Sequence, residues 1–80
     1  MKVRVLISPR PGVLDPEGSA VGQALSELGY REVVKVAAGR VIHLELDTQD
    51  PEQTRLRVVE MCEKLLANPV IESYEIEVET

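Results

Sequence analysis

Aromatic residues are almost missing from this chain: it contains no phenylalanine, no tryptophan and only two tyrosines in 80 residues. Its core must therefore be built from valine, leucine, isoleucine and alanine, which bury less apolar surface per side chain than aromatic rings do. A chain of this length buries only about 60–65% of its unfolded surface, so its core is small. Domains of this size usually gain further stability from disulfides, metals or association with other chains.

Cysteine and histidine are equally scarce. The single cysteine excludes a disulfide within the chain, and the single histidine argues against a zinc site. Association with other chains therefore remains as the expected source of additional stability.

Basic residues are outnumbered, since 14 acidic and nine basic side chains give a net charge of −5. A nucleic-acid-binding protein usually carries a basic stripe, and none is visible, so we expect no nucleic-acid partner. The longest apolar runs stay well below the roughly 18 residues of a membrane span, and the segment after Met1 does not resemble a signal peptide. We therefore expect a cytoplasmic protein with no membrane partner. Without linkers or low-complexity segments, residues 1–80 are expected to form one domain.

The segment PRPGVLDPEGSAVGQALSELG, residues 9–29, carries clear helix start and stop signals. Asp15 is a good N-cap residue, because its carboxylate can accept hydrogen bonds from free amides of the first turn. Pro16 falls at the first helical position, where a missing N–H costs nothing. Gly29 can end the helix in a left-handed conformation. An apolar face with helical spacing lies between these signals: Val21, Ala24, Leu25 and Leu28.

Alternating apolar residues predict four strands, at residues 2–8, 31–37, 40–47 and 71–78. The dipeptide Ala38-Gly39 is expected to form a hairpin turn in which Gly39 supplies a positive φ. A second helix is expected from Pro51 to about Ala67, with an apolar side made of Leu56, Val59, Cys62, Leu65 and Leu66. The order β-α-β-β-α-β predicts an α+β, ferredoxin-like sandwich, in which both helices cover one face of a four-stranded antiparallel sheet.

The chemically active residue types offer no catalytic constellation. His43 lies on an outward strand position without a metal-ligand partner at suitable spacing, which favours a solvated or interface residue. Cys62 lies on the apolar side of the second helix, which favours an inert buried thiol. Glu75, Glu77 and Glu79 share one face of the last strand but are about 7 Å apart along it, too far to share one ion closely. We expect no catalytic, cofactor-binding or metal-binding residue in this chain.

A stripe of small residues in the first predicted helix lowers the stability of that helix. Gly18, Gly22, Ser26 and Gly29 form a stripe of small residues beside the apolar face of the first helix. A glycine inside a helix costs roughly 1 kcal/mol relative to alanine, so the stripe needs a reason. Small residues let another backbone come close. That backbone belongs either to the domain's own sheet or to another subunit, and the sequence favours neither.

Three segments together resemble the PurS family: VLDPEGSAVGQALSELGY at residues 13–30, the turn at Gly39-Arg40, and MCEKLLANPVIESYEIEVE at residues 61–79. Members of this family are the small subunit of formylglycinamide ribonucleotide amidotransferase in purine biosynthesis. The resemblance covers essentially the whole chain. Where the family often has lysine before the PGVLDP segment, this chain has Arg10, which keeps the charge with a different geometry.

The resemblance implies a non-catalytic accessory subunit. In this family a glutaminase subunit releases ammonia from glutamine, and a large synthetase subunit uses ATP and Mg²⁺ to convert the amide to the amidine. The small subunit joins the two as a homodimer or dimer of dimers and supports ammonia transfer between them. It is expected to bind no cofactor itself. The residues expected at its interfaces are Arg10, Asp15, Pro16, Gly18, Gly22 and Arg40.

Two alternatives stay open on the residues alone. The segment RPGVL after a first strand is similar to the start of ACT-type domains, which bind amino acids between the first strand and the first helix. In those domains the helix begins directly after the motif, whereas Asp15-Pro16 restarts it here. The second alternative is an unrelated homo-oligomeric structural domain.

Overall fold

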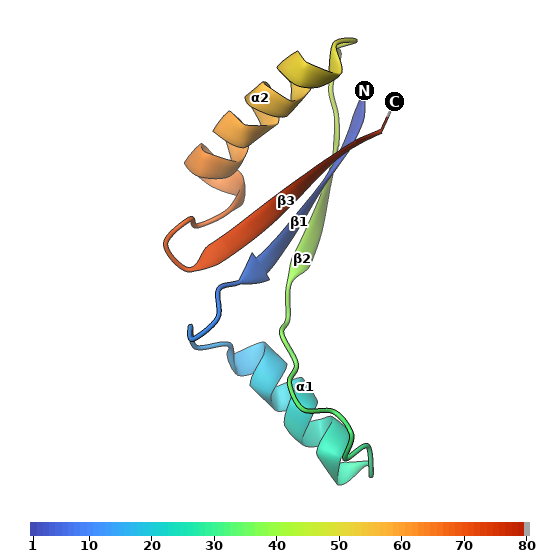
Figure 1. Cartoon of the computed structure of the whole chain (residues 1–80), viewed down its shortest axis with the longest axis vertical. Coiled ribbons are helices and arrows are strands. Elements are labelled where there is room, and N and C mark those ends of the chain that lie inside the picture. The colour runs from blue at the N-terminus through green and yellow to red at the C-terminus, as the bar shows by residue number, and fades with distance from the viewer. Residues whose placement is uncertain (80) are drawn as a thin grey trace.

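Figure 1 shows the computed structural model of the chain, which describes residues 1–79. Along the chain the elements are β1 (Lys2–Pro9), α1 (Pro16–Glu27), β2 (Arg40–Glu45), α2 (Pro51–Met61), the π-helical turn η1 (Cys62–Leu66) and β3 (Glu72–Glu79). The described chain is therefore an α+β protein with two α-helices and a three-stranded antiparallel sheet. The start of β1 and the end of β3 lie at one end of the sheet, and α1 lies beyond the other end (Figure 1).

The sheet has the strand order β2-β1-β3, so β1 lies in the middle and is antiparallel to both neighbours. Alternation along β1 places Val3, Val5 and Ile7 on the inner face, where each is at most 1% exposed. Their partners across the sheet extend this core: Ile42 and Leu44 on β2, and Tyr74, Ile76 and Val78 on β3. Three of the four expected strands and their inward faces are thus confirmed.

The second helix begins and ends close to its predicted limits. The Asp50 carboxylate accepts a hydrogen bond from the Glu52 amide at 3.1 Å, as an N-cap residue does. After Met61 the helix widens into η1, and the Ala67 amide donates to the Cys62 carbonyl at 3.1 Å, the spacing of a π-turn. One helical segment therefore runs from Pro51 to Leu66.

The side of this helix that packs on the sheet differs from the predicted one. Thr54, Val58 and Cys62 are fully buried, whereas Leu56 and Leu65 are exposed. Thr54 can be buried because its hydroxyl shares a 2.6 Å hydrogen bond with the hydroxyl of Thr48, which satisfies both polar groups. Of the predicted apolar side, Cys62 is buried and Leu66 packs against the core, whereas the placement of Leu56 and Leu65 on the packed side was wrong.

Helix α1 has the predicted caps but does not cover the sheet. Asp15 accepts from the Gly18 amide at 3.0 Å, and Gly29 has a φ of +102°. In Figure 1, α1 and the following residues to 38 lie beyond the end of the sheet, which lengthens the molecule to 48 × 25 × 14 Å. We call residues 13–38 the α1 lobe. Leu28, on the predicted apolar face, is 74% exposed. The expectation that both helices cover one face of the sheet is therefore wrong, since only α2 does so.

The expected fourth strand is also absent from the described structure: residues 31–37 form no strand and run beside α1 (Figure 1). The hairpin at Ala38-Gly39 does not form, and Gly39 has no positive φ. Two contacts hold the chain straight at this point. The Ala38 amide donates to the Asp15 carboxylate at 3.0 Å, and Gly39 lies so close to β1 that a Cβ atom there would collide with the Ile7 carbonyl oxygen. Residues 31–37 consequently follow α1 and not the edge of β2.

Candidate functional site

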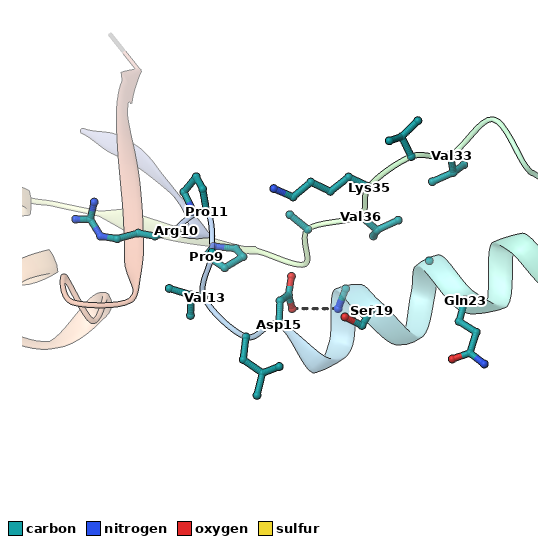
Figure 2. Close-up of a pocket in the computed structure, with 16 residues that line it drawn as sticks. Pro9, Arg10, Pro11, Val13, Asp15, Ser19, Gln23, Val33, Lys35 and Val36 are labelled. Atoms are coloured by element: carbon teal, nitrogen blue, oxygen red, sulfur yellow. Dashed lines mark hydrogen bonds between the residues drawn. The ribbon is translucent and has the colours of Figure 1, made fainter.

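An open groove of about 520 Å³ lies between the loop after β1, the first half of α1 and residues 33–37 (Figure 2). Four of the six expected interface residues line it: Arg10, Asp15, Gly18 and Gly22. Pro16 is exposed at the start of α1, outside the groove, and Arg40 lies at the start of β2. The structure therefore gathers four of these residues around one feature and leaves two beside it.

Asp15 is the polar centre of this groove. One carboxylate oxygen accepts from the Gly18 amide and the other accepts from the Ala38 amide, each at 3.0 Å. These hydrogen bonds, the one from Ala38 first, hold the pKa of the Asp15 carboxyl below its ordinary value of 3.8. Figure 2 shows the carboxylate between the start of α1 and the strand-like segment opposite. Asp15 therefore links α1 to residues 36–38, and the same two hydrogen bonds favour the ionised form of its carboxyl group.

The two helical glycines on the stripe face the chain's own backbone. A Cβ atom on Gly18 would lie 2.7 Å from the Val36 carbonyl oxygen and would also collide with the Asp15 carboxylate. A Cβ atom on Gly22 would lie 3.5 Å from a methyl of Val36, an ordinary contact. Gly18 is thus required for the close approach of α1 to residues 33–37, whereas Gly22 leaves room for a methyl group.

Arg10 borders the groove, but its side chain extends away from it toward the loop before β3. Its amide donates to the Ile71 carbonyl and its Nε donates to the Pro69 carbonyl, both at 2.9 Å. Figure 2 shows its side chain pointing away from α1. The guanidinium is exposed, so its free N–H groups remain available to a partner's acceptor.

Arg40 also contacts the loop before β3, through Leu66 and Glu72. Its guanidinium forms an ion pair with Glu72 at 2.6 Å and donates to the Leu66 carbonyl at 2.7 Å. Glu72 also accepts from the Asn68 amide at 2.8 Å. The Arg40 guanidinium, followed by the Asn68 amide, lowers the pKa of the Glu72 carboxyl from its ordinary value of 4.5. Arg10 and Arg40 together therefore fix the conformation of residues 66–72.

The residues considered for chemistry lie apart from this groove. His43 is exposed on the outer face of the sheet, opposite Arg4. Cys62 is fully buried, and this burial raises the pKa of its thiol, which favours the unreactive neutral form. Glu77 pairs with Arg4 across the sheet at 2.9 Å. Among residues 1–79, no three His, Cys, Asp or Glu side chains are grouped so that they could hold a metal ion. Nor does any helix in this range have the length and apolar character to cross a membrane.

Exposed apolar side chains are the feature that sequence reasoning missed. Several large ones are mostly exposed in the single chain: Leu14, Leu28, Val34, Leu65 and Val70. Val34, at 97%, is almost fully exposed although it alternates in the sequence as the buried valines of β1 do. Periodicity alone therefore cannot separate a strand that enters the chain's own core from one that does not.

These observations define a class: a small α+β protein whose exposed apolar surfaces suit contacts with other chains. Residues 2–80 match the PurS family model, described as phosphoribosylformylglycinamidine (FGAM) synthase. The chain belongs to this family.

Similar proteins agree with this membership over nearly the whole chain. The FGAM synthase subunit PurS of Bacillus subtilis is 50% identical over 78 residues, which are 98% of this chain and 92% of the relative. The crystal structure of PurS from Methanocaldococcus jannaschii, described as one of the subunits of formylglycinamide ribonucleotide amidotransferase, has a TM-score of 0.86 at 43% identity and covers 99% of this chain and 95% of that one. A chain in the structure of PurLQS from Thermotoga maritima has a TM-score of 0.85 at 36% identity, over 95% of this chain and 93% of that one.

Proposed function

We propose that this chain is the non-catalytic accessory subunit that joins the glutaminase and synthetase subunits of a glutamine- and ATP-dependent FGAM synthase. The observation that carries the proposal is the family match over residues 2–80. The similar chain from Thermotoga maritima supports it, because the structure that contains that chain is described as PurLQS, an assembly of more than PurS alone. Membership of this family favours this role over an ACT-like sensing domain, which rests on the RPGVL segment only.

We further propose that the chain acts as a homodimer or a dimer of dimers. Support comes from the α1 lobe, where Leu28 and Val34 are exposed and a helix of 12 residues has no cover from the sheet. An isolated helix of this length is marginal in water, and most helical stability in proteins comes from packing of an apolar face. A second copy would provide that packing.

The polar groups of the candidate residues support a structural role. The charged groups of Asp15 and Arg40 form hydrogen bonds and an ion pair within the chain. Such contacts suit a structural subunit. In the proposed complex this cytoplasmic subunit binds no cofactor, and ATP and Mg²⁺ belong to the synthetase subunit. Its contact surface supports ammonia transfer by keeping water away from the path between the two catalytic subunits.

Assembly of the three purified chains tests this proposal. The chain is mixed with the glutaminase and synthetase subunits of the same organism, and the mixture is separated by size-exclusion chromatography with light scattering. We expect one complex that contains all three chains and separates into its parts when this chain is left out. Catalytic subunits that associate equally well without it would contradict the proposed role. A rise in its melting temperature with free amino acids would favour the ACT-like alternative.

A further inference from the structure

We propose that the free edge of β3 is closed to other sheets, because Arg55 of α2 and the glutamates of β3 keep a second copy from adding its own strand there. The inference goes beyond the proposed function, since it concerns a surface through which the chain does not assemble. It depends on contacts within the single chain and holds whichever other surface meets a partner.

One side of β3 has no strand partner in the described sheet, because the strand order β2-β1-β3 pairs β3 with β1 alone. In an antiparallel ladder only every second residue bonds to a given neighbouring strand. The Glu72 amide donates to the Asn68 carbonyl at 2.7 Å. The Ile76 carbonyl accepts from Arg55 at 3.0 Å. Since neither bond goes to β1, the even-numbered residues of β3 face the free edge. A strand of eight residues with such an edge is a template for a further strand.

Arg55 covers the middle of this edge. It follows the buried Thr54 on α2, so its side chain leaves the helix beside the face that packs on the sheet. Its guanidinium donates to the Ile76 carbonyl. An added strand would need this carbonyl as an acceptor, and the guanidinium takes the place of the donor that the strand would bring. A strand that docks here must therefore break a hydrogen bond to a charged group, one of the stronger kinds in proteins.

Further contacts hold the helical segment beside β3. Helix α2 packs against this strand and lies next to it in Figure 1. In η1, which continues α2, the Glu63 carboxylate accepts from the Tyr74 hydroxyl at 2.8 Å. The Glu72 amide, which faces the free edge, is already bonded to the Asn68 carbonyl. An arriving strand therefore meets a helical segment that is fixed in place, and it finds the first donor of the edge in use.

The outer face of β3 carries a row of like charges, Glu75, Glu77 and Glu79. Across the β1–β3 pair Glu77 binds Arg4 at 2.9 Å, whereas Glu75 lies opposite the uncharged Leu6. If β3 of a second copy paired with this strand in one continuous sheet, with both α2 helices on the same face, the two rows of glutamates would lie opposite each other. Like charges directly opposite across a strand pair are destabilising. The row therefore disfavours pairing between two copies in particular.

A closed edge keeps the assembly of this chain finite. Pairing of β3 with β3 would join two copies by the same strand. Together with any contact at another surface of the chain, it would link copies into an open filament and not a closed oligomer. Arg55 and the glutamates remove this route and leave other surfaces free for association.

Two double variants with the net charge of the unaltered chain test the inference. Arg55→Ala with Glu75→Gln uncovers the edge and removes a charge from the row. Arg57→Ala with Glu60→Gln removes an exposed ion pair from the same helix and is the control. Light scattering at rising concentration measures the weight-average mass, and circular dichroism checks that both variants keep their fold. We expect the mass of the Arg55 variant to reach at least about twice that of the control, since each new edge contact joins two of the species present. Equal masses would overturn the inference.

Amide hydrogen exchange shows whether β3 is the strand that joins. By the alternation along β3, the amides of Tyr74 and Val78 face the free edge, and those of Glu75 and Glu77 face β1. In the unaltered chain we expect the first two to exchange faster than the second two at every concentration. In the assemblies of the Arg55 variant, the first two should become protected. Slow exchange at Tyr74 and Val78 in the unaltered chain, or large assemblies of the variant in which these amides stay unprotected, would overturn the inference.

Discussion

The Asp15 carboxylate accepts a hydrogen bond from the Ala38 amide across 23 residues of sequence, and this contact is one of the two that direct the chain away from a hairpin. The same carboxylate caps α1 through the Gly18 amide. One side chain thus starts the helix and fixes the segment beside it. The position of the α1 lobe depends on it.

Replacing this carboxylate should loosen the lobe. Asp15→Asn keeps one acceptor oxygen in place of two, so one of the two hydrogen bonds is lost. We expect faster amide hydrogen exchange along α1 and at Ala38, with little change in the strands. Asp47→Asn, a change at an exposed aspartate outside the lobe, is the control. Unchanged exchange in α1 of the Asp15 variant would contradict this role.

Acid should weaken the fold through Asp15 and Glu72. The folded-state pKa of each carboxyl is lowered, so each contributes stability that is present above its ordinary value and lost as the pH falls through the folded-state value. The ordinary values are 3.8 for Asp15 and 4.5 for Glu72. The free energy of unfolding should therefore exceed that of an Asp15→Asn, Glu72→Gln double variant at neutral pH, and the two should converge in acid. Urea unfolding at a series of pH values measures the difference. A gap that stays constant into acid would contradict the assignment.

The two helical glycines should respond in opposite directions to the same change. Gly22→Ala meets Val36 at an ordinary distance and should stabilise α1 by up to about 1 kcal/mol, the helix-propensity difference. Gly18→Ala would collide with the Val36 carbonyl oxygen and the Asp15 carboxylate, and overpacking of this kind costs about 1–3 kcal/mol. Thermal unfolding followed by circular dichroism compares the two variants. Equal shifts would show that α1 does not lie against Val36.

The residues that start and stop helices were predictable, because caps are local. Asp15, Pro16 and Gly29 act within one turn of their own position, and the structure places each as the sequence predicts. The fourth strand was not predictable in this way. Its alternation is genuine, but its path depends on contacts with distant residues that no local pattern contains.

Among the candidate interface residues too, some features could be predicted from the local sequence and others depend on distant contacts. Gly18 was singled out because a helical glycine is costly, and the structure supplies a reason in the Val36 backbone. Arg10 and Arg40 were expected at interfaces, and both also hold the loop before β3. Exposure of Val34 could not be predicted, since a valine in an alternating segment is usually buried.

The core on the inner face of the sheet should carry most of the stability of the single chain. Ile7 belongs to this core and is 1% exposed, so Ile7→Ala should lower the free energy of unfolding by about 2–5 kcal/mol. Val70→Ala shortens a side chain that is already mostly in water. This change should alter the free energy of unfolding by less than about 0.5 kcal/mol. Denaturant unfolding of both variants provides the comparison. Similar losses would place the stabilising core elsewhere.

The most direct measurement of the accessory role is amidine formation by the reconstituted enzyme, with glutamine or with ammonia as the nitrogen source. Without this chain we expect glutamine-dependent synthesis to be lost, while ammonia-dependent synthesis by the synthetase subunit persists in part. Adding the chain back should restore the glutamine-dependent reaction. Glutamine-dependent synthesis that proceeds at the full rate in its absence would contradict the account.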